Sequence, residues 1–208
     1  MRTNLPRYIV LLTLAPLLGG CMAAAITAGA AGAAGTASVS ADRRTVGTVV
    51  DDEAIELKAR KEFLADKDLA AQAHINVTSF NGRVLLTGEA PTEILRTRAG
   101  QLVAAISKVS NVHNEITIAA PSSLTSRTSD TLITSKVKTK IVADEGTSGF
   151  HVKVVTENGV VYLMGLVSGD EANDIVDVAR NVGGVQRVVN LFEPGSIAEA
   201  AAPTPDSG

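Results

Sequence analysis

The sequence predicts an α+β protein built from two copies of one unit, each ordered helix, strand, strand, helix, strand. Three observations lead to this prediction. A stretch that begins at residue 74 is repeated from residue 151, each copy contains an Asn-Gly pair between two runs of alternating apolar residues, and helix-like segments lie before and after those runs. Such a unit buries two helices on one face of a small three-stranded mixed sheet.

The N-terminal residues have the features of an export signal. A positively charged start is followed by an apolar run over residues 8–18, which is about half of the ~20 residues that span a bilayer. Leu18-Gly19-Gly20-Cys21 comes next, and Cys21 is the only cysteine in the chain. These small residues before a cysteine resemble the lipobox of bacterial lipoproteins, which implies cleavage before Cys21 and covalent acyl and diacylglycerol groups on that residue. An ordinary cleavage within residues 22–25 is the alternative.

Acylation at Cys21 implies a protein that is anchored to a bilayer without spanning it, because each buried methylene contributes ~0.8 kcal/mol. In similar enterobacterial lipoproteins, Asp after the cysteine signals retention in the inner membrane. Met22 stands at that position here. The resemblance therefore implies the outer membrane, with the protein facing the periplasm.

Composition excludes some classes of function. The formal net charge is −3, which argues against nucleic acid as a partner because phosphate binding needs a dense basic field. A single cysteine allows no disulfide within the chain, so packing must supply the stability.

Each copy of the repeat is centred on a β-hairpin. An offset of 77 residues aligns His74 with His151, Asn81-Gly82 with Asn158-Gly159, and Gly88 with Gly165. Asn-Gly between two period-2 stretches predicts a type I′ turn, because both residues tolerate a positive φ. The sequence therefore predicts two antiparallel hairpins.

Helices and a last strand complete each unit. Asp52 is expected to cap a helix over residues 53–66, and Asp130 one over residues 131–143, by accepting hydrogen bonds from the first turn. The second helices are expected over residues 92–108 and 170–182, and the last strands over residues 112–118 and 185–192. The closing segments align best at an offset of 73, which predicts four extra residues in the first copy.

The expected organisation follows from these elements and from the Ala, Gly, Ser, Thr and Pro content of the segments between them. It comprises a signal peptide at 1–20, an acylated N-terminus and tether at 21–48, a first domain at 49–119, a linker at 120–128, a second domain at 129–192 and a disordered tail at 193–208.

The repeat resembles the BON domain, whose pattern is a strand, Asn-Gly, a Val-x-Leu-x-Gly strand, a helix and a last strand. Asn81-Gly82-Arg83-Val84-Leu85-Leu86-Thr87-Gly88 carries the pattern in the first copy, and Asn158-Gly159-Val160-Val161-Tyr162-Leu163-Met164-Gly165, closed by Gly184-Val185, carries it in the second. Together with the lipobox, residues 46–193 are similar to the dual-BON outer-membrane lipoproteins of the division- and lipid-associated (DolP) family. This resemblance implies two tandem BON domains in a non-catalytic protein that supports envelope integrity, binds anionic phospholipid such as phosphatidylglycerol or cardiolipin through the second domain, and gathers at the division site.

The first helix of the second copy fits such a role. At about 100° per residue, Ile133, Val137 and Ile141 share the face that should meet the sheet. The sequence between Asp130 and Asp144 contains no acid. Basic residues near an anionic surface contribute about 1 kcal/mol each, so the candidate lipid-binding residues are Leu132, Ser135, Lys136, Lys138, Thr139, Lys140 and Val142. Similar proteins often carry an aromatic residue where Leu132 stands, and Leu lacks the amphipathic ring that anchors at headgroup depth, so weaker binding is expected.

The matching helix of the first copy has mixed charge: Glu53, Glu56 and Glu62 alternate with Lys58, Arg60 and Lys61. This charge pattern is typical of a helix that faces solvent or a protein partner. An alternative function follows from it, namely a periplasmic adaptor that uses this helix or a sheet edge to hold an envelope assembly or proteolysis component.

No catalytic or metal site emerges from the sequence. The three histidines, His74, His113 and His151, supply no pair with metal-ligand spacing. The chain contains no Gly-x-Ser-x-Gly elbow and no phosphate loop. The protein is therefore expected not to be an enzyme and to need no cofactor or metal.

Overall fold

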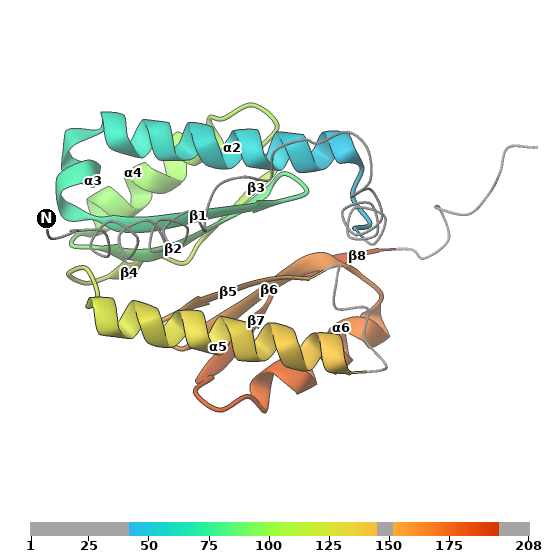
Figure 1. Cartoon of the computed structure of the whole chain (residues 1–208). Helices are drawn as coiled ribbons and strands as arrows, with labels where there is room; N and C mark the ends of the chain where they lie inside the picture. Colours follow the sequence, from blue (N-terminus) through green and yellow to red (C-terminus); the bar gives the residue numbers. More distant parts are fainter. Residues whose placement is uncertain (1–41, 145–151, 196–208) are drawn as a thin grey trace, which may run out of the picture. The chain divides into compact units, whose positions relative to one another are not determined.

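The computed structural model describes residues 42–144 and 152–195, which form two α+β units in succession (Figure 1). The helices are α2 (Val46–Ala65), α3 (Lys67–Gln72), α4 (Glu93–Ala104), α5 (Leu124–Ala143) and α6 (Gly169–Arg180). The strands are β1 (His74–Phe80), β2 (Arg83–Ala90), β3 (Asn111–Asn114), β4 (Thr117–Ile118), β5 (Val152–Glu157), β6 (Val160–Val167), β7 (Arg187–Asn190) and β8 (Glu193–Pro194). The expected α+β class and the order helix, strand, strand, helix, strand are confirmed in both units.

Each unit contains a mixed sheet. β1 pairs antiparallel with β2, and β2 pairs parallel with β3; β5, β6 and β7 repeat this arrangement. The two-residue strands β4 and β8 add short parallel pairings to β2 and β6, so each sheet has a fourth strand that was not expected. The short helix α3 of the first unit was also not expected.

Both hairpin turns have the predicted conformation. Asn81 and Gly82 have φ values of 53° and 75°, and Asn158 and Gly159 have values of 48° and 75°. Positive φ at both central positions defines the type I′ turn, whose twist matches that of the flanking strands. The Asn-Gly pairs therefore fix the register of both hairpins.

The first helix of each unit begins earlier than expected. The side chain of Thr45 caps α2 by accepting from Thr48 N, and that of Ser123 caps α5 by accepting from Ser126 N. The predicted caps at Asp52 and Asp130 are therefore wrong. α5 begins at Leu124, inside the range assigned to the linker, 120–128. α2 likewise begins inside the range assigned to the tether, and β8 lies inside the range assigned to the tail.

The two aspartates serve the hairpins instead. Asp52 accepts from the backbone amides of Asn81 and Gly82 at 2.8 and 2.9 Å, and Asp130 accepts from those of Asn158 and Gly159 at 2.9 Å each. Both side chains are buried. The interior of each helix is thus tied to a turn far along the chain, which a local capping rule does not anticipate.

The two copies are also closer in length than the sequence alignment indicated. Val112 pairs with Val84, as Val188 pairs with Val161, so the last strands correspond at an offset of 76. The left-handed residues Lys108 and Gly184 obey the same offset. The predicted insertion of four residues is therefore wrong: one residue differs, in the turn between β2 and α4.

Side chains from the central strands alternate between two cores. In β2, Val84 and Leu86 belong to the core beneath α2 and α4, whereas Leu85 points to the other face of the sheet. In β6, Val161 and Leu163 belong to the core beneath α5 and α6. A third cluster joins the opposite faces of the two sheets through Phe80, Leu85, Tyr162 and Met164. Both faces of each sheet are therefore covered.

Candidate membrane-binding site

Helix α5 presents two different faces. Ile133, Val137 and Ile141 are at most 5% exposed and pack in the core, as the sequence predicted. On the outer face, Leu132 and Val142 are 57% and 50% exposed. Exposed apolar side chains on one face of a helix mark a candidate interaction surface.

The hydroxyl groups on this outer face are bonded to the helix itself. Thr131, Ser135 and Thr139 each donate to the carbonyl oxygen four residues earlier, at 2.9, 3.0 and 2.9 Å. The hydroxyl groups therefore already donate a hydrogen bond within the helix. Less free energy is needed to move this face out of water than its number of hydroxyl groups indicates.

The three lysines lie at the borders of the outer face. Lys136, Lys138 and Lys140 are all exposed, and in the described part of the chain none of them is held in an ion pair. Long aliphatic stems allow such side chains to keep their ammonium groups at a charged surface while the helix lies against apolar material. The seven residues chosen from the sequence are thus on the surface of a single helix.

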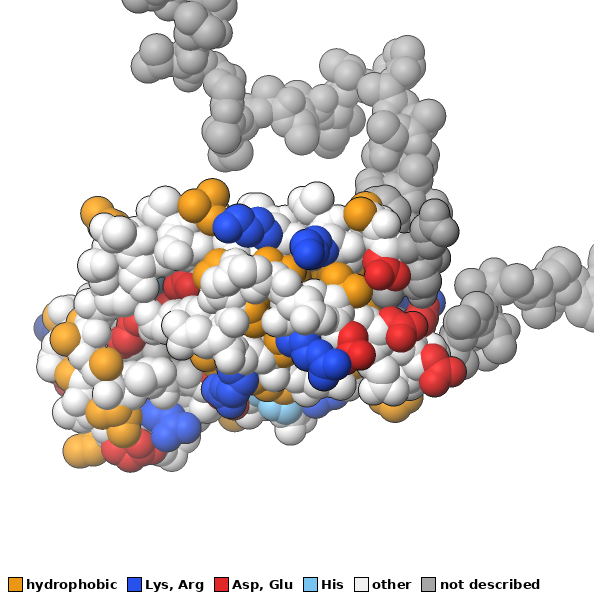
Figure 2. Space-filling view, turned by 90° about the horizontal axis from the view of Figure 1, so that it is seen from below, with side chains coloured by type: hydrophobic (Ala, Val, Ile, Leu, Met, Phe, Trp, Pro, Cys, Tyr) orange, Lys and Arg blue, Asp and Glu red, His pale blue; other side chains and the backbone are white. Residues whose placement is uncertain are grey.

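The acid at the start of this region is turned away from the surface. Asp130 is only 6% exposed because its carboxylate binds the hairpin turn. The neighbouring helix α6, in contrast, exposes Asp170, Asp174 and Asp177. Figure 2, which views the face covered by α5 and α6, shows basic side chains across its middle and several acidic ones toward one end. An anionic surface would therefore be met by α5 and not by α6.

The comparison with known proteins places this geometry in a family. The BON domain family model matches residues 51–120 and 129–193. The chain belongs to the BON-domain family, as a dual-BON protein of the DolP type.

Three curated relatives illustrate the range of similar proteins. The chain is 35% identical to "Outer membrane lipoprotein DolP" of Haemophilus influenzae over 91% of its own length and 96% of that protein. It is 38% identical to the "21 kDa hemolysin" of Actinobacillus pleuropneumoniae over 73% of the chain and 78% of that protein. It is 31% identical to the "Osmotically-inducible protein Y" of Escherichia coli over 73% of the chain and 77% of that protein.

The early start of α5 adds a residue to the surface of the second BON domain that the sequence analysis missed. Leu124, in the first turn, is 78% exposed. The signal for it was Ser123, whose side chain accepts from Ser126 N as an N-cap. The outer face therefore extends from Leu124 to Val142.

Polar contacts join the two BON domains around the cluster between their sheets. Asn76 donates to Glu157 at 3.0 Å, Asn158 donates to Glu89 at 2.9 Å, and Lys153 donates to Glu56 at 2.8 Å. These contacts were not predicted from the sequence, because each residue lies far from its partner along the chain. The contacts fix the position of β5 and its hairpin against the first domain.

Two carboxylates, those of Glu89 and Glu157, are buried in this interface. Burial raises the pKa of Glu157, and the negative charge of Glu89 raises it further, against the opposing effect of the hydrogen bond from Asn76. Glu89 is 2% exposed. Within the described residues, its Oε2 accepts no hydrogen bond. The interface is therefore sensitive to the ionisation of Glu157.

The described histidines, His74 and His113, form no metal site. His113 lies 2.8 Å from the Arg83 guanidinium, and burial lowers its pKa; His74 begins β1, and His151 lies outside the described residues. No group of three or more potential metal-ligating side chains occurs within residues 42–144 and 152–195.

The predicted lipidation site Cys21 and the signal peptide lie outside the described residues. In the part of the chain that the structure covers, no helix is both long enough and apolar enough to cross a bilayer.

Proposed function

We propose that this chain is a non-catalytic outer-membrane lipoprotein that binds anionic phospholipid through α5 of its second BON domain and supports envelope integrity at the division site. Its anchor is a set of acyl and diacylglycerol groups on Cys21, and the body of the protein faces the periplasm. Phosphatidylglycerol and cardiolipin are the lipids that the charge of the site favours.

One observation carries the lipid-binding part of this proposal. The outer face of α5 combines exposed apolar side chains, hydroxyl groups that are bonded internally, and three lysines without an ion-pair partner among the described residues. The headgroup layer offers phosphate to the lysines and hydrocarbon to Leu132 and Val142.

The localisation rests on the leader and on similarity. Leu18-Gly19-Gly20-Cys21 has the composition of a lipobox, and the Haemophilus influenzae relative is named an outer membrane lipoprotein. Replacement of Cys21 by Ala should abolish labelling with a radioactive fatty acid and release the protein into the soluble periplasm. Undiminished labelling of that variant would contradict the anchor.

Flotation with liposomes tests lipid binding. A fragment that begins at Ser38 should float with phosphatidylglycerol vesicles and not with phosphatidylcholine vesicles. Leu132→Glu should weaken binding, and Lys136→Glu and Lys138→Glu should each weaken it by about fivefold or more, because a basic residue near an anionic surface contributes about 1 kcal/mol and the new charge is repelled. Added salt should reduce only the lysine contribution.

Lys58→Glu is the matched control, since Lys58 is also exposed but belongs to α2 of the first domain. It should leave flotation unchanged, and circular dichroism should show that all variants are folded. Equal losses from Lys58→Glu and Lys136→Glu would mean nonspecific attraction. Absence of binding by the unmodified fragment would favour the alternative function, a periplasmic adaptor for an envelope protein.

A further inference from the structure

The residues that lead into α2 contact both BON domains. Arg43 and Arg44 are neighbours in the chain, but the side chain of Arg43 binds the second domain and that of Arg44 binds the first. The two side chains are only 19% and 11% exposed. They lie where the segment that comes from Cys21 enters the described part of the chain. The point of entry is therefore attached to two domains at once.

Arg43 is held on the second domain by three hydrogen bonds. Its Nη1 and Nη2 donate to the two carboxylate oxygens of Glu171 at 2.9 and 2.8 Å, and Nη1 also donates to the carbonyl oxygen of Leu166 at 2.8 Å. Paired bonds between a guanidinium and a carboxylate restrict orientation as well as distance. Glu171 is itself fixed, because its Oε2 accepts from the backbone amide of Ser168 in the capping box of α6. Arg43 thus joins the chain to the start of α6 and the end of β6.

Arg44 is held on the first domain. Its Nη1 donates to Asp52 at 2.8 Å, and its guanidinium carbon lies 4.0 Å from the centroid of the Phe80 ring. A guanidinium over an aromatic face is attracted by the ring, more strongly where water is excluded. Asp52 also holds the first hairpin turn, and Phe80 belongs to the cluster that joins the two sheets. Arg44 therefore lies at the border of the contact between the domains.

The two attachments leave little slack. Consecutive Cα atoms are 3.80 Å apart, so the second domain cannot move away from the first at this place without breaking the bonds of Arg43 or those of Arg44. The start of α2 does not require the bonds of Arg43, because Thr45 caps that helix. The bonds of Arg43 therefore serve the connection to the second domain and not the formation of α2.

We infer that Arg43 and Arg44 form a strap that fastens the second BON domain directly to the entry of the membrane tether, with the Arg43–Glu171 contact as its end on that domain. The role of the strap rests on the proposed function, which places the anchor at Cys21 and the lipid-binding surface on α5. With the strap closed, α5 and the end of the tether move as one body. With Arg43 released, they are connected only through the first domain.

Trypsin provides a first measurement, because it cleaves after Lys and Arg. No Lys or Arg occurs between Cys21 and Asp42, so Arg43 and Arg44 are the first sites after the tether. In the closed strap both guanidinium groups are bonded and largely buried. Cleavage of the full chain at these sites should therefore follow the population of the open strap. The mass of the product identifies the cut and does not depend on lipid binding or on the anchor.

Glu171→Gln should raise the rate of this cleavage about fivefold, because hydrogen bonds to a charged group are roughly twice as strong as neutral ones. Gln is also accepted at the third position of a capping box, so α6 should keep its start. Asp174→Asn is the matched control, since it removes the same charge from an exposed position of α6. Its cleavage rate should stay within about twofold of that of the unmodified chain, because salt screens exposed charges.

Distances between nitroxide labels show which domain the entry segment follows. One label is attached to Ala41→Cys, and the other to Asn173→Cys on α6 or to Lys61→Cys on α2, in the full chain. Arg43→Gln should broaden the distance distribution from position 41 to α6 by about twofold or more. It should leave the distribution from position 41 to α2 unchanged, because Arg44 still binds Asp52. Labelling of the chain without introduced cysteines would reveal an unmodified Cys21 and so tests the anchor separately.

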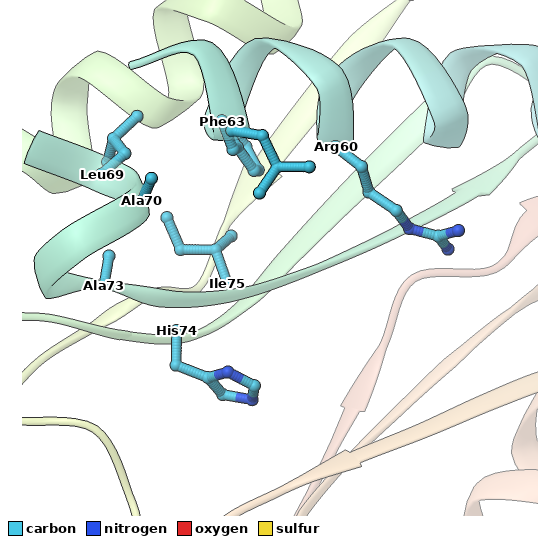
Figure 3. Close-up of a pocket in the computed structure, with 8 residues that line it drawn as sticks. Arg60, Phe63, Leu69, Ala70, Ala73, His74 and Ile75 are labelled. Atoms are coloured by element: carbon cyan, nitrogen blue, oxygen red, sulfur yellow. The ribbon is translucent and has the colours of Figure 1, made fainter. Parts of the chain in front are cut away.

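Arg60→Gln is the matched control for Arg43→Gln. Arg60 forms its ion pair within α2, with Glu56 at 3.0 Å, and its side chain is 58% exposed. Figure 3 shows this side chain leaving α2 away from the apolar hollow beside Phe63. Glu56 keeps its bond from Lys153 when Arg60 is replaced. The substitution should therefore change neither distance distribution.

Three results would overturn the inference. Equal cleavage rates for Glu171→Gln and Asp174→Asn would mean that Glu171 does not hold Arg43. If Arg43→Gln broadens neither distribution, the strap has no end on the second domain. If it broadens both, the segment is not held on the first domain by Arg44, and the two arginines do not act as a strap.

Discussion

Replacement of Asp130 by Ala tests how the second BON domain is held together. Asp130 lies inside α5, and its carboxylate accepts from the amides of Asn158 and Gly159 at 2.9 Å each while being 6% exposed. The substitution removes both bonds without changing the apolar face of the helix. It leaves two turn amides without their acceptor.

The expected cost follows from these contacts. A hydrogen bond to a charged group contributes about 1.5–3 kcal/mol, so the loss of two such bonds should cost ~3–6 kcal/mol. The substitution also removes the free-energy cost of burying a charged carboxylate, which lowers this figure. A loss of about 3 kcal/mol in the free energy of unfolding is expected. With a urea m value of ~2 kcal/mol/M, the midpoint should fall by about 1.5 M.

Tyrosine fluorescence provides a domain-specific assay. The chain has no Trp and two Tyr, of which Tyr8 is absent from a fragment that begins at Ser38. Tyr162 is then the only strong emitter, and it is buried in β6 of the second domain. Urea unfolding monitored by this signal therefore reports on the domain that contains Asp130.

Asp174→Ala is the control, because it makes the same chemical change at an exposed position of α6 and should alter stability by no more than about 0.5 kcal/mol. If Asp130→Ala costs as little as Asp174→Ala, the carboxylate does not hold the hairpin to the helix.

Three further changes test the interface, the N-terminal contact and the hairpin. Burial is the main cause that raises the pKa of Glu157 above its ordinary 4.5, and the charge of Glu89 adds to it. The stabilisation that this side chain contributes is therefore fully present below pH 4.5 and is lost as the pH rises through the raised pKa, and the melting temperature of Glu157→Gln should lack this decline. The hydrogen bond from Arg43 lowers the pKa of Glu171 to about 2, so carboxyl NMR titration of Arg43→Gln should show it returning toward the ordinary value. Gly88→Ala should prevent soluble expression, because φ is +109° and the new Cβ would collide with the backbone of the neighbouring strand, whereas Gly183→Ala, which meets nothing within 4 Å, should express normally.

The hairpins and the buried face of α5 could be predicted because local chemistry determines them. Asn-Gly permits the positive φ values of a type I′ turn, and the positions of Ile133, Val137 and Ile141 follow from helical periodicity alone. The same reasoning placed the lysines and Leu132 on the surface. These features need no information from distant parts of the chain.

The starts of α2 and α5 could not be predicted reliably because two kinds of residue compete for the role of cap. Asp52 and Asp130 have the composition of N-caps, but their carboxylates bind turn amides 29 and 28 residues away. Thr45 and Ser123 cap the helices instead. A sequence pattern does not tell which amides a buried carboxylate will meet.

The contact between the two sheets also has a signal in the sequence. Val84-Leu85-Leu86 and residues 160–164 are continuously apolar, as is typical of strands covered on both faces. One covered face was expected, under the helices. The structure shows that Leu85 and Tyr162 meet on the other face.

By itself, the sequence determined the two repeated units, their turns and the residue types on the outer face of α5, since each depends on neighbours a few positions apart. Only the tertiary structure decided which face of each sheet meets the other domain, that Asp130 is buried within the otherwise basic helix α5, and that Val50, Leu57 and Leu64 are exposed. The physical reason is that burial depends on contacts between residues far apart in the chain, and free energy is gained there only after the whole fold has brought them together.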